Sequence, residues 1–177
     1  MARELLLLEG GQRIDVHAGR DAAFLAACEN GHLGIVRLLL SLDGDRYMNV
    51  HMGGGAAFRG ACRRGHAAIV ELLLSLSGDR RIGVHAIIGM DTFHLACQHG
   101  HAAVAQLLLS LDGDRRIDVH AGRCVAFRTA CRWGNAACVE LLLSLDGDRQ
   151  IDMYSWGEEA FRIACEHGHE GVVRLLL

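Results

Sequence analysis

The strongest constraint on this chain is an internal repeat, because one pattern of residues returns every 34 or 35 positions. Each copy has a phenylalanine, a cysteine four residues later, and a glycine three residues after the cysteine. The phenylalanines are Phe24, Phe58, Phe93, Phe127 and Phe161. Repeats of this length are typical of arrays in which small units stack side by side, since one unit cannot bury its own apolar face. We therefore expect an extended array and not a compact globule.

One copy of the repeat predicts two short helices joined by a tight turn. Phe58 and Cys62 are four residues apart, so they share one face of a helix. Gly65 follows where a helix would end in the left-handed conformation. Residues 66–76 carry apolar side chains at helical spacing, which predicts a second helix. Such short helices are marginal alone in water, so the predicted fold is an all-α helix-turn-helix solenoid of about five repeats.

These residues resemble the ankyrin repeat family, whose units are about 33 residues long. The resemblance rests on an aromatic residue shortly before Ala-Cys, on Gly-His between the helices, and on Leu-Leu-Leu at the end of the second helix. It covers essentially the whole chain and implies a single ankyrin repeat domain over 1–177, with long loops or short hairpins between repeats. The implied units are a partial repeat at 1–14 and repeats at 15–48, 49–82, 83–117, 118–151 and 152–177.

The start of each unit departs from the family's Thr-Pro-Leu-His pattern. The chain contains no proline, and Ala22-Ala23-Phe24-Leu25 is the form that this start takes in the first full unit. The family's threonine normally caps the first helix. Here only Asp91 can cap from that position, and Asp21 is expected to cap its own helix from one residue earlier.

The composition argues against several classes of function. A net charge of −3 leaves no basic footprint for nucleic acid or an anionic membrane surface, and no apolar run approaches the ~20 residues of a membrane-spanning helix. Seven cysteines are an odd number, which argues against a fully paired disulfide framework and favours a reducing, intracellular compartment, cytoplasmic or nuclear. No nucleophile or phosphate-binding pattern is present, so we expect neither catalysis nor a cofactor.

The recurring cysteines are expected in the core, because a free cysteine packs as a small hydrophobe. Cys124 lies outside that series, in a predicted loop, and is expected to be an exposed thiol. Cys97, His99 and His101 alternate with other residues, but the glycine between the histidines breaks the helix and the ligands do not converge, so no metal site is predicted. A metal- or thiol-responsive Cys/His protein is the alternative function.

Two series of histidines are interpreted as structural. One follows the glycine of the turn and is expected to bond backbone groups between repeats. The other is expected to line the loop edge, and its members are His17, His51, His85 and His120.

Positions that vary between units are the candidates for binding, since shared positions build the stack. The two residues between each cysteine and its glycine vary, as do the loop tips. In proteins that this chain resembles, the first helices and loop tips form a concave binding groove. Arginine and tryptophan are enriched in interface hot spots. The predicted partner-binding residues are Arg63, Arg64, His99, Arg132, Trp133, Trp156, Ile87 and Ile88.

The predicted function is a protein–protein interaction module, an adaptor or scaffold, whose protein partner carries acidic groups. A structural spacer in a longer chain is a further alternative. The apolar end Leu175-Leu176-Leu177 favours more repeats or a second domain beyond it. The chain is expected to be a monomer, with end-to-end stacking of two chains as the alternative.

Overall fold

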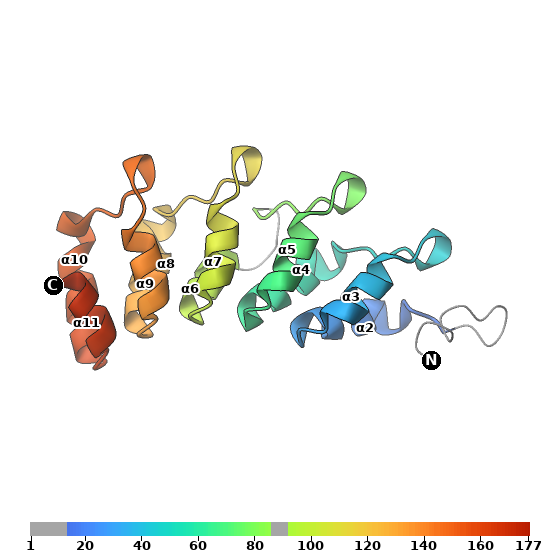
Figure 1. The fold of residues 1–177 in the computed structure, drawn as a ribbon, viewed down its shortest axis with the longest axis horizontal. Helices are drawn as coiled ribbons and strands as arrows, with labels where there is room; N and C mark the ends of the chain where they lie inside the picture. Colours follow the sequence, from blue (N-terminus) through green and yellow to red (C-terminus); the bar gives the residue numbers. More distant parts are fainter. Residues whose placement is uncertain (1–13, 86–91) are drawn as a thin grey trace.

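The computed structural model describes residues 14–85 and 92–177, which form five pairs of antiparallel helices in a row (Figure 1). Each pair has a first and a second helix. The pairs are α2 (Ala18–Glu29) with α3 (Leu33–Leu40), α4 (Met52–Arg64) with α5 (Ala67–Leu74), α6 (Thr92–Gln98) with α7 (Ala102–Leu109), α8 (Ala121–Arg132) with α9 (Ala136–Leu143), and α10 (Met153–Glu166) with α11 (Glu170–Leu176). The predicted all-α solenoid is confirmed.

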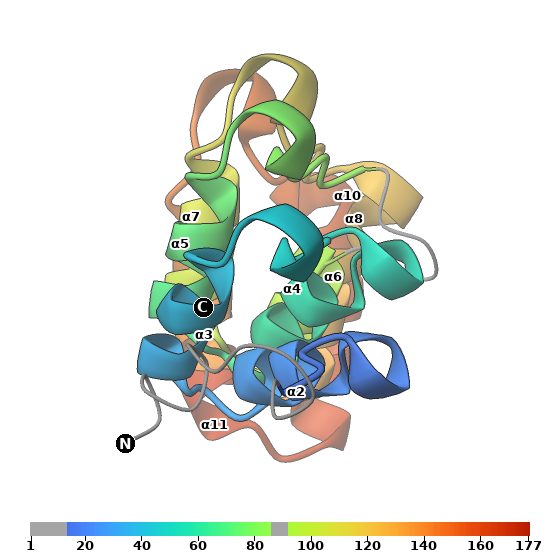
Figure 2. The same cartoon turned by 90° about the vertical axis from the view of Figure 1, so that its right-hand side faces the viewer.

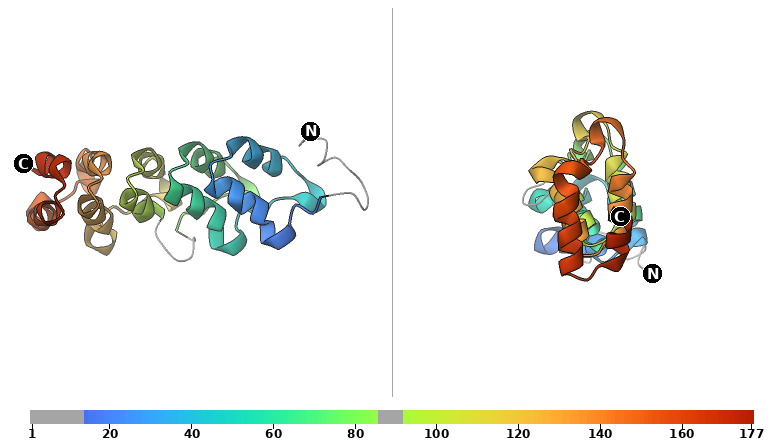
Figure 3. Two further views of the ribbon diagram at one scale, coloured as in Figure 1. Left: turned by 90° about the horizontal axis from the view of Figure 1, so that it is seen from below. Right: turned by 90° about the vertical axis from the view of Figure 1, so that its left-hand side faces the viewer.

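The helices form two layers. Each first helix contacts the first helix of the next pair, from α2 through to α10, and the second helices contact one another in the same order. Figure 2 shows the layers along the stack, and Figure 3 shows them from below as two rows. Because every helix is covered by its neighbours along the row, burial is supplied by the array and not by any single pair.

The loops between the pairs each contain a 3₁₀ helix, and these loops lie together along one edge of the stack, at the top of Figure 1. The 3₁₀ helices are η2 (Gly44–Arg46), η3 (Gly78–Arg80), η4 (Gly113–Arg115) and η5 (Gly147–Arg149). The described residues contain no strand, so the connections that are described in full, from α3 to α4, from α7 to α8 and from α9 to α10, are loops and not hairpins. The glycine turns within the pairs lie along the opposite edge.

The phenylalanines form a row along the core. Phe24, Phe58, Phe93 and Phe127 are at most 1% exposed. Phe161, in α10, the last first helix described, is only half-buried. The large side chains therefore occupy equivalent places in successive pairs and do not meet at a common centre.

Four cysteines of the recurring series have no exposed surface: Cys28, Cys62, Cys97 and Cys131. Burial raises the pKa of the Cys28 and Cys131 thiols to about 12. Cys165 corrects the expectation for this series, since it is exposed at the uncovered end of the stack.

The expectation that Cys124 is an exposed thiol is wrong: the residue is 2% exposed. Its backbone belongs to a left-handed turn of three residues, Gly122-Arg123-Cys124, that directs the side chain inward. The thiol lies 3.6 Å from Nδ1 of His120. The other ring nitrogen of His120 donates to a carbonyl oxygen, which leaves Nδ1 as the acceptor for the thiol proton.

The same left-handed turn opens three of the five first helices and lies directly before the position where the family has Thr-Pro. It is formed by Gly19-Arg20-Asp21 and Gly53-Gly54-Gly55 in the first two pairs, with φ between 60° and 77°. The prediction that Asp21 caps its helix is therefore wrong. Its carboxylate is buried and pairs with Nδ1 of His17 at 2.5 Å. Asp91, the other predicted cap, lies outside the described residues.

Both histidine series join neighbouring repeats, as predicted. After the glycine turns, Nε2 of His66 donates to the Glu29 carbonyl at 2.9 Å, and His101 does the same to Arg63. At the loop edge, Nε2 of His51 donates to the Asp79 carbonyl at 2.8 Å. Each of these three histidines thus satisfies a backbone carbonyl of an adjacent repeat and helps to keep the helix pairs in one register.

Candidate partner-binding surface

Five predicted contact residues gather at the ends of the first helices. Arg63 and Arg64 are the last residues of α4, and His99 follows α6. Arg132 is the last residue of α8, and Trp133 follows it. All five are exposed. We call these residues the turn edge, because each lies directly before a glycine turn, on the edge of the stack opposite the 3₁₀ helices. The helix must end there, since Gly65 and its equivalents adopt positive φ.

A carboxylate from the preceding repeat occupies the N-terminal part of the turn edge. Glu29, at the end of α2, forms an ion pair and hydrogen bond with Arg63. The same Glu29 oxygen lies 3.7 Å from a guanidinium nitrogen of Arg64. These groups are all well exposed, so solvent screens the pair and its contribution to stability is small.

The C-terminal part of the turn edge is open. Arg63 is preceded in the stack by the repeat that carries Glu29. In the repeat that precedes Arg132, the equivalent position is occupied by Gln98, which carries no charge. Glu166, in the following repeat, is paired with Arg162 of its own helix at 2.6 Å. Across residues 14–85 and 92–177, no carboxylate pairs with Arg132. Beside it, Trp133 is 58% exposed.

His99 lies between these two parts and stacks on His101, with 6.1 Å between the ring centroids. Partial burial, and then the nearby positive charges of His101, Arg63 and Arg64, lower the pKa of His99. His99 is therefore neutral at pH 7 and presents a polar ring between two arginine-rich positions.

Trp156 is not part of the turn edge. It lies near the start of α10, at the loop side of the first-helix layer, and is half-buried against the core. The Arg128 guanidinium lies 5.9 Å from the centre of its ring and donates to Glu159 at 2.7 Å. Arg128 was not among the predicted contact residues. The sequence pattern that could have identified it is the polar residue that directly follows the phenylalanine in most units. The predicted contacts Ile87 and Ile88 lie outside the described residues.

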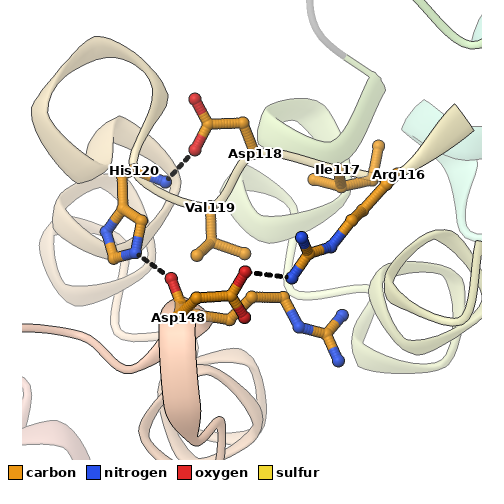
Figure 4. A pocket seen from close by; sticks show the side chains of 7 residues that line it. Arg116, Ile117, Asp118, Val119, His120 and Asp148 are labelled. Atoms are coloured by element: carbon orange, nitrogen blue, oxygen red, sulfur yellow. Dashed lines mark hydrogen bonds and ion pairs between the residues drawn. The ribbon is translucent and has the colours of Figure 1, made fainter. Parts of the chain in front are cut away.

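A small cavity of about 200 Å³ lies under the loop between α9 and α10 (Figure 4). Nε2 of His120 donates to the Asp148 carbonyl at 3.0 Å, and the Arg116 guanidinium pairs with the Asp148 carboxylate at 2.6 Å. That ion pair lowers the pKa of Asp148. An equivalent cavity lies beside His17 and Asp45. Its recurrence, and the use of its polar groups in bonds between repeats, mark it as part of the stack.

The described part of the chain contains no group of three or more His, Cys, Asp or Glu side chains placed to hold a metal ion. None of the described helices combines the length and the apolar character that crossing a bilayer requires.

Comparison with known proteins supports the architecture. Residues 93–177 match a family model described as ankyrin repeats, in three copies. No curated protein and no solved structure matches the chain. The helix pairs before residue 86 have the same phenylalanine, cysteine and glycine landmarks as the matched pairs and stack on them in the same way. Residues 93–177 thus carry ankyrin repeats, and the helix pairs before them continue the same architecture.

Proposed function

We propose that this chain is an adaptor or scaffold that binds a protein partner through its first-helix layer, with the turn edge at the centre of the contact. Ankyrin repeats in general are protein–protein interaction modules and are typically not enzymes. The observation that carries the proposal for this chain is the pair formed by Arg132 and Trp133. An exposed indole stands beside a guanidinium that no carboxylate among the described residues neutralises.

The energetics of association favour this pair over the rest of the surface. Covering an exposed indole removes a large apolar area from water, and Trp and Arg are the residue types that dominate interface energies. Polar residues on the loop edge recur from unit to unit and are used within the stack, as His51 and His120 show. Trp156, Ile87 and Ile88 remain proposed contacts of the loop side, and an intracellular location remains the proposed setting for the free thiols.

Charge reversal on the turn edge tests the proposal. The double variant Arg63→Glu/Arg132→Glu is expected to lose a partner that wild type captures by affinity purification, identified by mass spectrometry. Its helical circular-dichroism spectrum and melting temperature should stay unchanged, because both side chains are exposed.

The matched control is Arg37→Glu/Arg174→Glu, which makes the same change in charge on exposed positions of the second helices. This control should still capture the partner. If the turn-edge variant retains every protein that the control captures, the turn edge is not the binding surface.

A further inference from the structure

Charge is divided between the two layers of the middle repeats. The first helices α4, α6 and α8 contain no Asp or Glu. The second helices α5, α7 and α9 contain no arginine, and their charged residues are Glu71 and Glu140. The arginines of these three first helices lie in α4 and α8, and they are Arg59, Arg63, Arg64, Arg123, Arg128 and Arg132. The net charge of −3 thus conceals a basic middle section of the first-helix layer, formed by α4, α6 and α8.

Carboxylates from the flanking repeats already bind this layer. Glu29 of α2 contacts Arg63 and Arg64, and Glu159 of α10 contacts Arg128. The guanidinium groups are therefore placed to bind carboxylates, and arginine suits this geometry better than lysine. The chain has no lysine at all.

We propose that α4, α6 and α8 bind an extended acidic segment of the partner, and that Glu29 competes with that segment for Arg63 and Arg64. This inference rests on the proposed function. Packed helices lie about 8–10 Å apart, so the two steps from α4 to α8 span about 16–20 Å. An extended chain covers that distance with about six residues. One acidic group meets Arg63 and Arg64, another meets Arg132, and an adjacent apolar side chain covers Trp133.

The acidic flanks favour a short acidic protein segment over nucleic acid. Glu29 lies at one end of the basic layer, and Glu159 and Glu166 lie at the other. A long polyanion that ran along the whole stack would meet these carboxylates, whereas a segment of about six residues fits between them. The test must therefore distinguish binding of an acidic peptide from binding of an oligonucleotide.

The test uses a defined probe on the full chain. The probe is a fluorescein-labelled peptide of about nine residues, all glutamates except one central phenylalanine. A peptide with glutamine at each glutamate and an oligothymidylate of equal charge serve as controls. Fluorescence anisotropy gives the affinities. In a Trp156→Phe variant, where Trp133 is the one remaining tryptophan, the indole emission reports occupancy of the turn edge.

The acidic peptide is expected to bind, and the glutamine peptide and the oligonucleotide to bind at least tenfold more weakly. Arg132→Gln should lower the affinity for the acidic peptide about five- to tenfold. Glu29→Gln, which removes the competing carboxylate, should raise the affinity for the acidic peptide about two- to fivefold, as expected for an exposed ion pair. Arg37→Gln, on the second-helix layer, is the control and should leave the affinity unchanged.

Three results would overturn the inference: equal binding of the glutamine peptide, tighter binding of the oligonucleotide, or unchanged affinity in both Arg132→Gln and Glu29→Gln. The outcome is separable from that of the proposed function. If the acidic peptide does not bind while capture of the partner still depends on Arg63 and Arg132, the partner's contact segment is not acidic, but the turn edge remains the binding surface. If capture is independent of both arginines, the surface itself is wrong.

Discussion

Single polar side chains hold neighbouring repeats together at both edges of the stack. At the turn edge, the ring of His66 reaches the Glu29 carbonyl of the preceding repeat. At the loop edge, the guanidinium of Arg80 donates to the Leu40 carbonyl at 2.9 Å, while its face covers the Tyr47 ring at 4.3 Å. These carbonyls lie at helix ends, where the helix supplies no partner of its own. The repeated polar residues are therefore structural, and chemistry directed at a partner has to come from residues that do not repeat.

The pair of His17 and Asp21 makes part of the stability depend on pH. The hydrogen bond from Nδ1 of His17 to the buried Asp21 carboxylate raises the pKa of His17, to which the Asp45 carbonyl and the charge of Asp15 add. A raised pKa in the folded state stabilises the protein fully below the ordinary value of about 6.5, and that stabilisation is lost as the pH rises through the raised pKa.

Asp21→Asn is therefore expected to lower the melting temperature more at about pH 5.5 than at about pH 8.5. Asparagine tolerates the positive φ of this position, so the variant tests the charge and not the backbone. Melting curves of wild type and variant at both pH values give the comparison. An equal loss at both, or a larger loss at the higher pH, would show that the ion pair has no such role.

Residue environments were predictable where a pattern recurs and unpredictable where the backbone departs from it. The two histidine series were identified because they return in register, and their bonds are those expected. The burial of Cys124 and of Asp21 was missed, because three consecutive residues with positive φ are rare outside glycine. The one visible signal was Gly53-Gly54-Gly55, where glycine adopts this conformation readily.

At the scale of elements, each helix pair depends on the pairs beside it. The helices have 7 to 14 residues, which is too short for stability in isolation. Val36 and Val70 of the second helices are fully buried, and so are the phenylalanines of the first four first helices. Such elements were predictable from the 3.6-residue spacing of apolar side chains, whereas the 3₁₀ form of the loops was not, since Gly-Asp-Arg suits several kinds of turn.

The row of phenylalanines predicts that equal substitutions have unequal costs. Phe93→Ala, in the middle pair, is expected to lower the free energy of unfolding by about 3–5 kcal/mol, because it leaves a cavity that two neighbouring pairs enclose. Phe161→Ala should cost clearly less, since solvent already reaches that ring. Urea denaturation followed by circular dichroism measures both. A near-neutral Phe93→Ala, or equal losses in the two variants, would contradict the stacked core.

At the scale of the whole molecule, the array separates a conserved scaffold within the chain from a surface that changes from repeat to repeat. The period of 34 or 35 residues predicted the row of pairs, because a repeated unit with one apolar face has few ways to bury it. The distribution of charge between layers was only partly predictable. Arg63, Arg64, Arg132 and Trp133 could be singled out by comparing copies, but Trp156 proved to lie apart from them. Among the three arginines of the turn edge, Arg132 has no carboxylate partner in the described residues, because the preceding repeat supplies Gln98 where an earlier one supplies Glu29.

The claim that the turn edge and first-helix layer bind the partner is tested most directly by amide hydrogen exchange of the chain, free and in complex with its captured partner. The account predicts slower exchange on binding at the ends of α4, α6 and α8, with α5, α7 and α9 unchanged. Slower exchange confined to the second helices or to the 3₁₀ loops would contradict it.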